Sequence, residues 1–161
     1  MAITKLIADS ITSGAIANTP AFLATLGSTQ SVGDNSWTKA NINTEIFDTD
    51  NCFDASTNYR FTPNKAGKYF AFGQIFGDPG SASDLVYVYS GIYKNGSFVR
   101  YSSIDFRNNL GREATVLHTG IFDMNGSSDY LELYGNVNAN DGSGMKFNNN
   151  HTYFGAYKIL T

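Results

Sequence analysis

Hydrophobic and polar side chains alternate along most of this chain, and this alternation predicts β-strands. Tyr69, Ala71, Gly73 and Ile75 occupy every second position of one such run, as expected of a strand with one buried face. Similar runs follow one another towards the C-terminus. Predicted strands cover residues 21–26, 57–61, 68–76, 85–93, 97–106, 114–124, 130–137 and 152–160, with short pieces around Trp37, Ile42, Ile46 and Phe47.

Turn residues separate these runs. Asn95-Gly96 lies between two predicted strands, and Asn-Gly is the strongest short signal for a β-hairpin. Asn125-Gly126 marks a second turn, and residues 63–67 mark a third. Many strands separated by turn chemistry are typical of an all-β sandwich or barrel. We find no internal repeat and no convincing helical run in residues 20–161.

The first 19 residues differ from the rest. They are rich in Ile, Ala, Ser and Thr, and Pro20 closes the segment. Apolar residues there have a partly helical spacing, but the segment is too short and broken to fold alone. We therefore interpret residues 1–19 as an arm that becomes ordered against a partner, and residues 20–161 as one domain. A disordered leader is the alternative. The apolar docking residues of the predicted arm are Ile3, Leu6, Ile7, Ile11 and Ile16.

Composition excludes several classes of partner. Charged residues make up 16% of the 161 residues, below the roughly 25% of average soluble domains. The net charge is −3 and the 11 basic residues are scattered, so we expect no nucleic-acid partner. No apolar run reaches the roughly 20 residues of a membrane span, so we expect no membrane insertion. The start lacks the apolar core of a signal peptide, so we do not expect secretion by the general route.

Five pieces of the sequence, in this order and spacing, resemble the globular head of the complement C1q and tumour-necrosis-factor (TNF) superfamily. They are Phe53–Pro63, Ala66–Phe70, Ile92–Gly96, Asp129–Leu133 and Tyr153–Tyr157. The resemblance implies a ten-strand antiparallel jelly roll, non-enzymatic and packed as a threefold homotrimer around the inner sheet. The residues expected at the trimer interface are Tyr69, Ala71, Phe154, Ala156 and Tyr157. Because a strand repeats every two residues, a shift of one position would exchange the faces.

The N-terminal segment resembles the leader of small structural proteins of bacteriophages, particularly marine ones. This resemblance implies a virion protein that is assembled in the host cytoplasm. It would be a decoration protein or the globular tip of a fibre on the phage head or tail. Its arm would attach to other virion proteins, and its head would face a host. A secreted C1q-like ligand or adhesin is one alternative. A capsule-degrading glycosidase is another, and it would need two carboxylates such as Asp105 and Glu132 close together.

The jelly roll predicts that three connections gather at the end far from the arm. These are residues 77–83, 107–112 and 138–150, and the last exceeds the usual hairpin length. Their amides and carboxylates can bond sugar hydroxyls, so we expect them to bind a host-surface glycan, with a solvated loop tip as the alternative. The candidate ligand-binding residues are Asp78, Asn108, Asn109, Asn140, Asp141 and Asn148.

Two further groups of side chains suggest sites. Asp48, Asp50 and Asp54 place oxygen ligands within a short segment, as a Ca²⁺ site would, but turns stabilised by Asp look the same in sequence and we favour the turns. No catalytic motif is present, and we expect no enzyme activity and no cofactor. Four tyrosines exceed what a small core can hide and indicate a surface where rings meet a partner. They are Tyr87, Tyr89, Tyr93 and Tyr101.

Overall fold

The computed structural model describes residues 18–80 and 84–160, and every regular element in these ranges is a β-strand. Eight strands have five or more residues, and five have only two. In chain order they are β1 (Ala21–Thr25), β2 (Gln30–Ser31), β3 (Thr38–Lys39), β4 (Thr44–Asp48), β5 (Phe53–Asp54), β6 (Arg60–Phe61), β7 (Ala66–Asp78), β8 (Leu85–Lys94), β9 (Ser97–Asp105), β10 (Ala114–Asn125), β11 (Leu131–Ala139), β12 (Lys146–Phe147) and β13 (Tyr153–Leu160).

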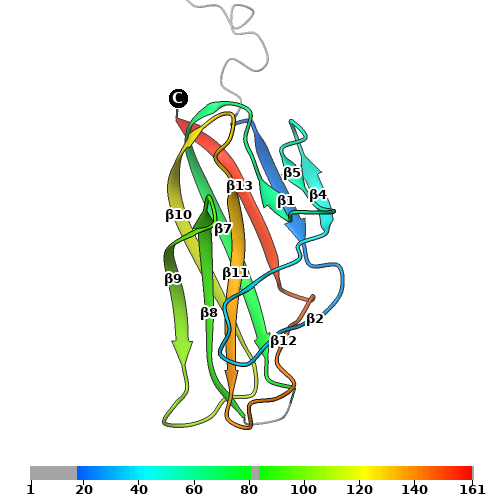
Figure 1. Cartoon of the computed structure of the whole chain (residues 1–161), viewed down its shortest axis with the longest axis vertical. Coiled ribbons are helices and arrows are strands. Elements are labelled where there is room, and N and C mark those ends of the chain that lie inside the picture. The colour runs from blue at the N-terminus through cyan, green and yellow to red at the C-terminus, as the bar shows by residue number, and fades with distance from the viewer. Residues whose placement is uncertain (1–17, 81–83, 161) are drawn as a thin grey trace, which may run out of the picture.

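The strands form two sheets that pack face to face (Figure 1). Sheet A runs β10-β7-β13-β1-β4, and β12 and β2 extend it beside the far end of β7. Sheet B runs β9-β8-β11-β6-β5, with β3 also paired to β11. All these pairs are antiparallel. The prediction of an antiparallel all-β sandwich is confirmed. The described residues hold thirteen strands, five of them of two residues, whereas the resemblance implies ten.

The long strands place the start of β1 and three of the connections at opposite ends of the sandwich. The start of β1 and the end of β13 lie at one end, here called the arm end (Figure 1). The connections β7–β8, β9–β10 and β11–β12 lie at the other, here called the distal end. This is the arrangement that the alternation of strand direction predicts.

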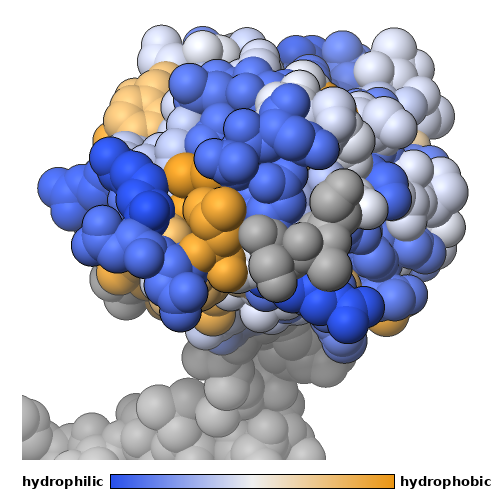
Figure 2. Space-filling view, turned by 90° about the horizontal axis from the view of Figure 1, so that it is seen from below, coloured by the Kyte–Doolittle hydropathy of each residue, from blue (hydrophilic) through white to orange (hydrophobic). Residues whose placement is uncertain are grey.

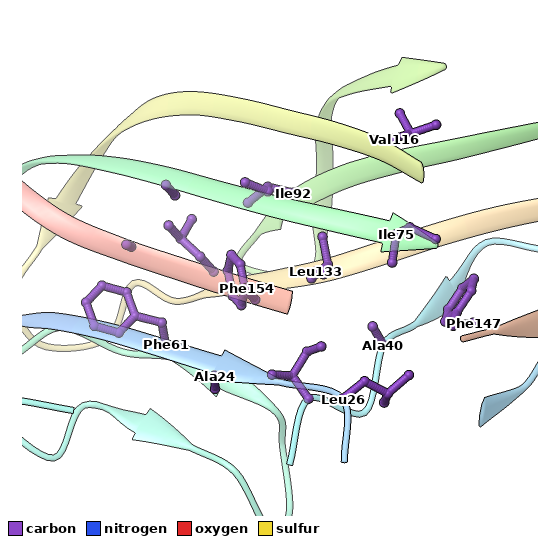
Figure 3. Packing of buried hydrophobic residues seen from close by; sticks show 14 of the residues in the cluster. Ala24, Leu26, Ala40, Phe61, Ile75, Ile92, Val116, Leu133, Phe147 and Phe154 are labelled. Atoms are coloured by element: carbon purple, nitrogen blue, oxygen red, sulfur yellow. The ribbon is translucent and has the colours of Figure 1, made fainter. Parts of the chain in front are cut away.

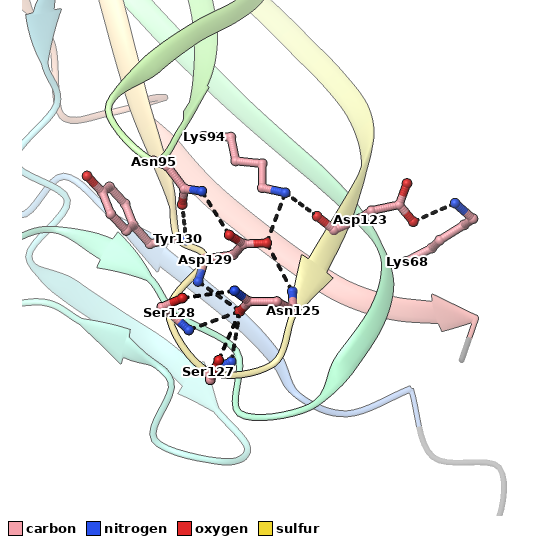
Figure 4. Close-up of polar contacts among 9 residues, drawn as sticks. All are labelled: Lys68, Lys94, Asn95, Asp123, Asn125, Ser127, Ser128, Asp129 and Tyr130. Carbon is pink, nitrogen blue, oxygen red and sulfur yellow. Dashed lines mark hydrogen bonds and ion pairs between the residues drawn. The ribbon is translucent and has the colours of Figure 1, made fainter.

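Side-chain hydrogen bonds tie two turns together at the arm end (Figure 4). Asn95 and Gly96 both have positive φ, 53° and 73°, as a two-residue hairpin of type I′ requires. The Asn95 side chain donates to the Asp129 carboxylate at 2.8 Å, and Lys94 pairs with the same carboxylate at 2.9 Å. Asp129 lies in the β10–β11 connection, which crosses from sheet A to sheet B. These contacts therefore fix one sheet to the other.

The core lies between the sheets (Figure 3). Near the arm end it is aromatic: the Phe22 ring stacks on Phe53 at 4.4 Å and on Phe61 at 4.7 Å between centroids. Phe154 meets Phe22 edge to face at 5.1 Å. Towards the distal end Ile75 and other aliphatic residues pack with the Phe147 ring. In the described residues no helix is long and apolar enough to cross a membrane.

Candidate functional site

The outer face of sheet A, the face turned away from sheet B, carries three rows of side chains that run across the strands. One row is Ile121, Phe70, Tyr157 and Ala21, and the next is Thr119, Phe72, Gly155, Leu23 and Phe47. The third is Leu117, Gln74, Tyr153 and Thr25. Each row follows from the register, because residues opposite one another in antiparallel strands share a face.

Much of this face is apolar and reaches solvent in the single chain. Ile121 is 62% exposed and Leu117 is 47% exposed. Phe70 packs against Tyr157 at 5.6 Å between ring centroids. The Phe72 ring lies over Gly155, where a Cβ atom would come within 2.5 Å of it. Contiguous exposed apolar surface of this kind marks an interaction site on a soluble protein.

The structure corrects the predicted trimer interface. Tyr69, Ala71, Phe154 and Ala156 are at most 1% exposed and point into the core between the sheets, so they cannot form contacts between copies. Only Tyr157 of the five lies on the outer face. The prediction was wrong by one residue in register, because β7 and β13 carry aromatic residues on both faces. Tyr69 instead donates its hydroxyl to the Lys65 carbonyl at 2.9 Å, and burial raises its pKa to about 12.

At the distal end the three predicted loops are neighbours. Asn140 donates its backbone N–H to the Asp84 carbonyl at 2.9 Å, which joins the β11–β12 connection to the start of β8. Leu85 and Gly111 exchange two backbone bonds of 2.9 Å, which joins the β9–β10 connection to the same place. Figure 2 shows this end: hydrophilic residues cover most of it, around an apolar patch.

The six predicted ligand-binding residues divide into two groups. Asn108 and Asn109 line an open recess of about 610 Å³ with Asp105, Phe106 and Arg107. The other four do not line it, and three of them use their side chains to stabilise their own turns. These three bonds join Asp78 to the N–H of Gly80, Asp141 to that of Ser143 and Asn148 to that of Asn150.

Asp105 and Arg107 face each other at the recess. The Arg107 Nε donates to the Asp105 carboxylate at 2.7 Å, and a second nitrogen of the same guanidinium contacts it as well. The Arg107 side chain holds the pKa of Asp105 below its usual value, and the Asp105 carboxylate in turn raises the pKa of Arg107. The recess therefore contains charge that is largely neutralised within the pair.

The three carboxylates considered for Ca²⁺ serve separate turns. Asp54 accepts the backbone N–H groups of Ser56, Thr57 and Asn58 at 2.9–3.1 Å, and these bonds hold its pKa well below the usual range. Asp48 accepts the N–H of Phe53 at 2.7 Å, and Asp50 pairs with a lysine. Within the described residues no three or more His, Cys, Asp or Glu side chains are grouped to hold a metal ion.

The outer face of sheet B carries seven neighbouring aromatic rings, which we call the aromatic band. Its members are Trp37, Tyr87, Tyr89, Tyr93, Phe98, Tyr101 and Tyr134. Tyr87 stacks on Tyr89 at 4.5 Å, and Tyr89 stacks on Tyr101 at 5.0 Å. Four of these residues are the surplus tyrosines that the sequence singled out. Trp37, Phe98 and Tyr134 were not among the residues predicted for this surface. Trp37 joins it because its segment pairs with β11, which is distant in the chain.

Trp37 comes from the β2–β3 connection, residues 32–37, which lies beside β11. Backbone hydrogen bonds from Asn35 to Val137 (3.0 Å) and from Ala40 to Leu133 (2.9 Å) hold this segment against β11. The indole lies over Gly91, where a Cβ atom would be 3.3 Å from the ring. Burial raises the pKa of Tyr93 and Tyr134 above the usual tyrosine value.

The structure separates the two carboxylates considered for a glycosidase. Asp105 lies opposite Tyr87 and Glu132 lies opposite Tyr93 on the same strand, β8. Six residues of strand span about 20 Å, whereas the two carboxylates of glycosidases lie roughly 5–9.5 Å apart. Glu132 is also buried in an ion pair with Lys39 at 2.9 Å. This pair cannot act together on one glycosidic bond.

The arm residues Ile3, Leu6, Ile7, Ile11 and Ile16 lie outside the described residues.

The comparisons with known proteins identify the fold. No family model matches the chain, and no curated protein matches it in sequence. Among solved structures, murine APRIL at pH 5.0 matches with a TM-score of 0.59 and 10% identity, over 86% of this chain and 98% of that one. The globular domain of zebrafish complement 1qA protein matches with a TM-score of 0.56 and 13% identity, over 88% and 98%. The chain therefore has a C1q/TNF-like jelly-roll fold.

Proposed function

We propose that this chain is a non-enzymatic attachment protein whose copies associate as a homotrimer through the outer face of sheet A. The observation that carries this proposal is the set of three rows across five strands, in which Ile121, Leu117 and Phe47 remain 47–62% exposed. Covering apolar surface stabilises an assembly by roughly 25 cal/mol per Å² before the cost of association. The trimeric habit implied by the family resemblance supports a threefold arrangement.

A charge placed in this face tests the association. Ile121→Asp leaves the single chain intact because the residue is mostly exposed, but it buries an unpaired carboxylate in the assembly. We expect association to weaken by about 3 kcal/mol or more, which is about 100-fold or more in affinity. Sedimentation equilibrium of the full chain measures the change.

Phe98→Asp, an equally apolar exposed site on sheet B, is the control and should leave the assembly unchanged. A wild-type protein with the mass of one 17.5 kDa chain at micromolar concentration would contradict the proposal.

The proposed setting is a phage virion, in which residues 1–19 attach the protein to the particle and the distal end faces a host glycan. The resemblance of the leader to phage structural proteins supports this setting, and so does the start of β1 at the end opposite the distal loops (Figure 1). Deleting residues 1–19 should keep the assembly but abolish its attachment to particles. Full occupancy of particles by the truncated protein would contradict the role of the arm.

A secreted ligand or adhesin of the C1q or TNF kind is the second candidate. The likeness in fold to murine APRIL and the zebrafish complement protein favours it. The two candidates differ in where the native protein is found. A virion protein sediments with purified particles at a constant copy number, whereas a secreted ligand is found free in the medium.

A further inference from the structure

We propose that the aromatic band and the recess at Asp105–Asn109 form one continuous site for a neutral oligosaccharide. The proposal rests on the glycan-attachment role proposed above and gives that role a specific place. The site differs from the one that the sequence predicts, because it uses the outer face of sheet B in addition to Asn108 and Asn109 of the distal loops.

The band and the recess meet at Tyr87. Asp105, which lines the recess, lies directly opposite Tyr87 in the register of β8 and β9. The Arg107 guanidinium carbon is 6.0 Å from the centre of the Tyr87 ring. From Tyr87 the stacked rings continue through Tyr89 to Tyr101 along the sheet. A linear ligand that enters the recess would therefore extend over aromatic rings.

The chemistry of this surface matches a sugar chain. A pyranose ring has an apolar C–H face, which packs on aromatic rings, and a rim of hydroxyls that needs hydrogen-bonding groups. Five of the seven band residues are tyrosines, each with an apolar ring and a polar tip. The recess adds two asparagine amides, and its volume of about 610 Å³ falls within the roughly 300–1,000 Å³ of small-ligand sites.

Charge selects a neutral ligand. The Asp105 carboxylate and the Arg107 guanidinium neutralise each other, so the recess offers no net charge to offset the desolvation of a charged sugar. Both groups can still bond the hydroxyls of a neutral one.

One buried group near the band lacks a hydrogen-bond donor. The Asn136 side chain is 4% exposed, and its Oδ1 has no partner among the described residues. Asn136 lies opposite Tyr89, so both side chains are on the outer face of sheet B. Unpaired buried oxygens are rare in folded proteins and require an explanation. A sugar hydroxyl that displaces part of the cover over Asn136 would supply the donor.

The single tryptophan of the chain reports on this site, because Trp37 belongs to the band. We would titrate the full-length protein with dextran, laminarin, mannan and a neutral galactan, and with alginate as an acidic polysaccharide. At least one neutral polysaccharide should change Trp37 fluorescence in a saturable way, and alginate should not. Tyr101→Ala should weaken that binding about tenfold, while Tyr101→Phe, which keeps the ring, should stay within about threefold of wild type.

Val99→Ala is the matched control, since it truncates another exposed apolar side chain on β9 that is not part of the band. It should leave binding unchanged.

Failure of all four neutral polysaccharides, or equal binding by Tyr101→Ala and wild type, overturns the proposal. The mass of each sample is measured alongside. A trimer that binds no polysaccharide overturns the site and leaves the association proposal intact. If Tyr101→Ala lowers the mass of the assembly, the band forms contacts between copies, and this result also overturns the proposed site.

Discussion

The two outer faces of the sandwich are both rich in aromatic residues, but they differ in what covers them. On sheet A, Phe70, Phe72 and Tyr157 spread across neighbouring strands, and no described segment crosses them. On sheet B the β2–β3 connection lies beside β11, and its Trp37 side chain packs over the sheet among rings that already stack on one another. An open apolar face is best covered by a large partner, because burial of its whole area from water stabilises the complex most. A packed band of amphipathic rings suits a narrow ligand that needs both ring faces and hydroxyl partners.

The largest expected effect is a difference in folding stability between substitutions on the two sides of β13, the side that faces the core and the side that faces outwards. Phe154→Ala removes a buried ring that packs against Phe22 and Phe53, so we expect the free energy of unfolding to fall by about 3–5 kcal/mol. Tyr157→Ala removes a ring from the outer face of sheet A and should cost the single chain less than about 1 kcal/mol. Urea denaturation of both variants measures the difference.

The same two variants test the corrected register. Tyr157→Ala should weaken association of copies, which sedimentation detects, while its folding remains near wild type. Equal destabilisation by both substitutions would mean that Phe154 and Tyr157 do not lie on opposite faces of the strand.

A smaller effect is expected where a glycine lies under an aromatic ring on each face. Gly91→Val pushes against Trp37 and the Arg100 carbonyl, and we expect a cost of about 1–3 kcal/mol with a red shift in tryptophan emission. Gly155→Val meets the Phe72 ring and the Phe22 carbonyl on sheet A. It should leave the emission of Trp37 unchanged and weaken association. An emission shift in both variants would contradict the separation of the two faces.

The smallest effect concerns the edge where the sheets meet. His118 on β10 lies 3.1 Å from the Ser102 hydroxyl on β9, and burial together with the nearby Arg100 lowers its pKa from 6.5. A lowered histidine pKa means that the folded state favours the neutral ring. Stability from this group is therefore complete above pH 6.5 and is lost as the pH falls below 6.5 through the folded pKa. Thermal denaturation between pH 7 and pH 5 measures this loss.

His118→Gln should remove this part of the pH dependence, and His151→Gln, at an exposed position, should not. An identical pH profile for wild type and His118→Gln would show that His118 does not titrate in this way.

The strands of the domain could be predicted from sequence to within a few residues. The alternation in residues 68–76 gave one long strand, and β7 extends it at both ends to Ala66 and Asp78. The Asn95-Gly96 hairpin was also correctly placed, because only residues tolerant of positive φ fit such a turn. The two-residue strands β2 and β12 were missed, since they pair with each other across more than a hundred residues of the chain.

The candidate sites were less accessible from sequence. Asn108 and Asn109 were placed in loops at the correct end, but the partners that make a recess with them, Asp105 and Arg107, were not recognised. The surplus tyrosines pointed to a surface, whereas their association with Trp37 depends on the pairing of the β2–β3 connection with β11.

The amino-acid sequence by itself determined that this chain forms an antiparallel β-sandwich, because a period of two and well-placed turn residues specify strands locally. Only the tertiary structure decided which side of each strand faces the core. Tyr69 and Phe70, or Phe154 and Tyr157, are equally suited to either face. The choice depends on pairing with β1, β10 and the opposite sheet, and these long-range contacts are not written in any single strand.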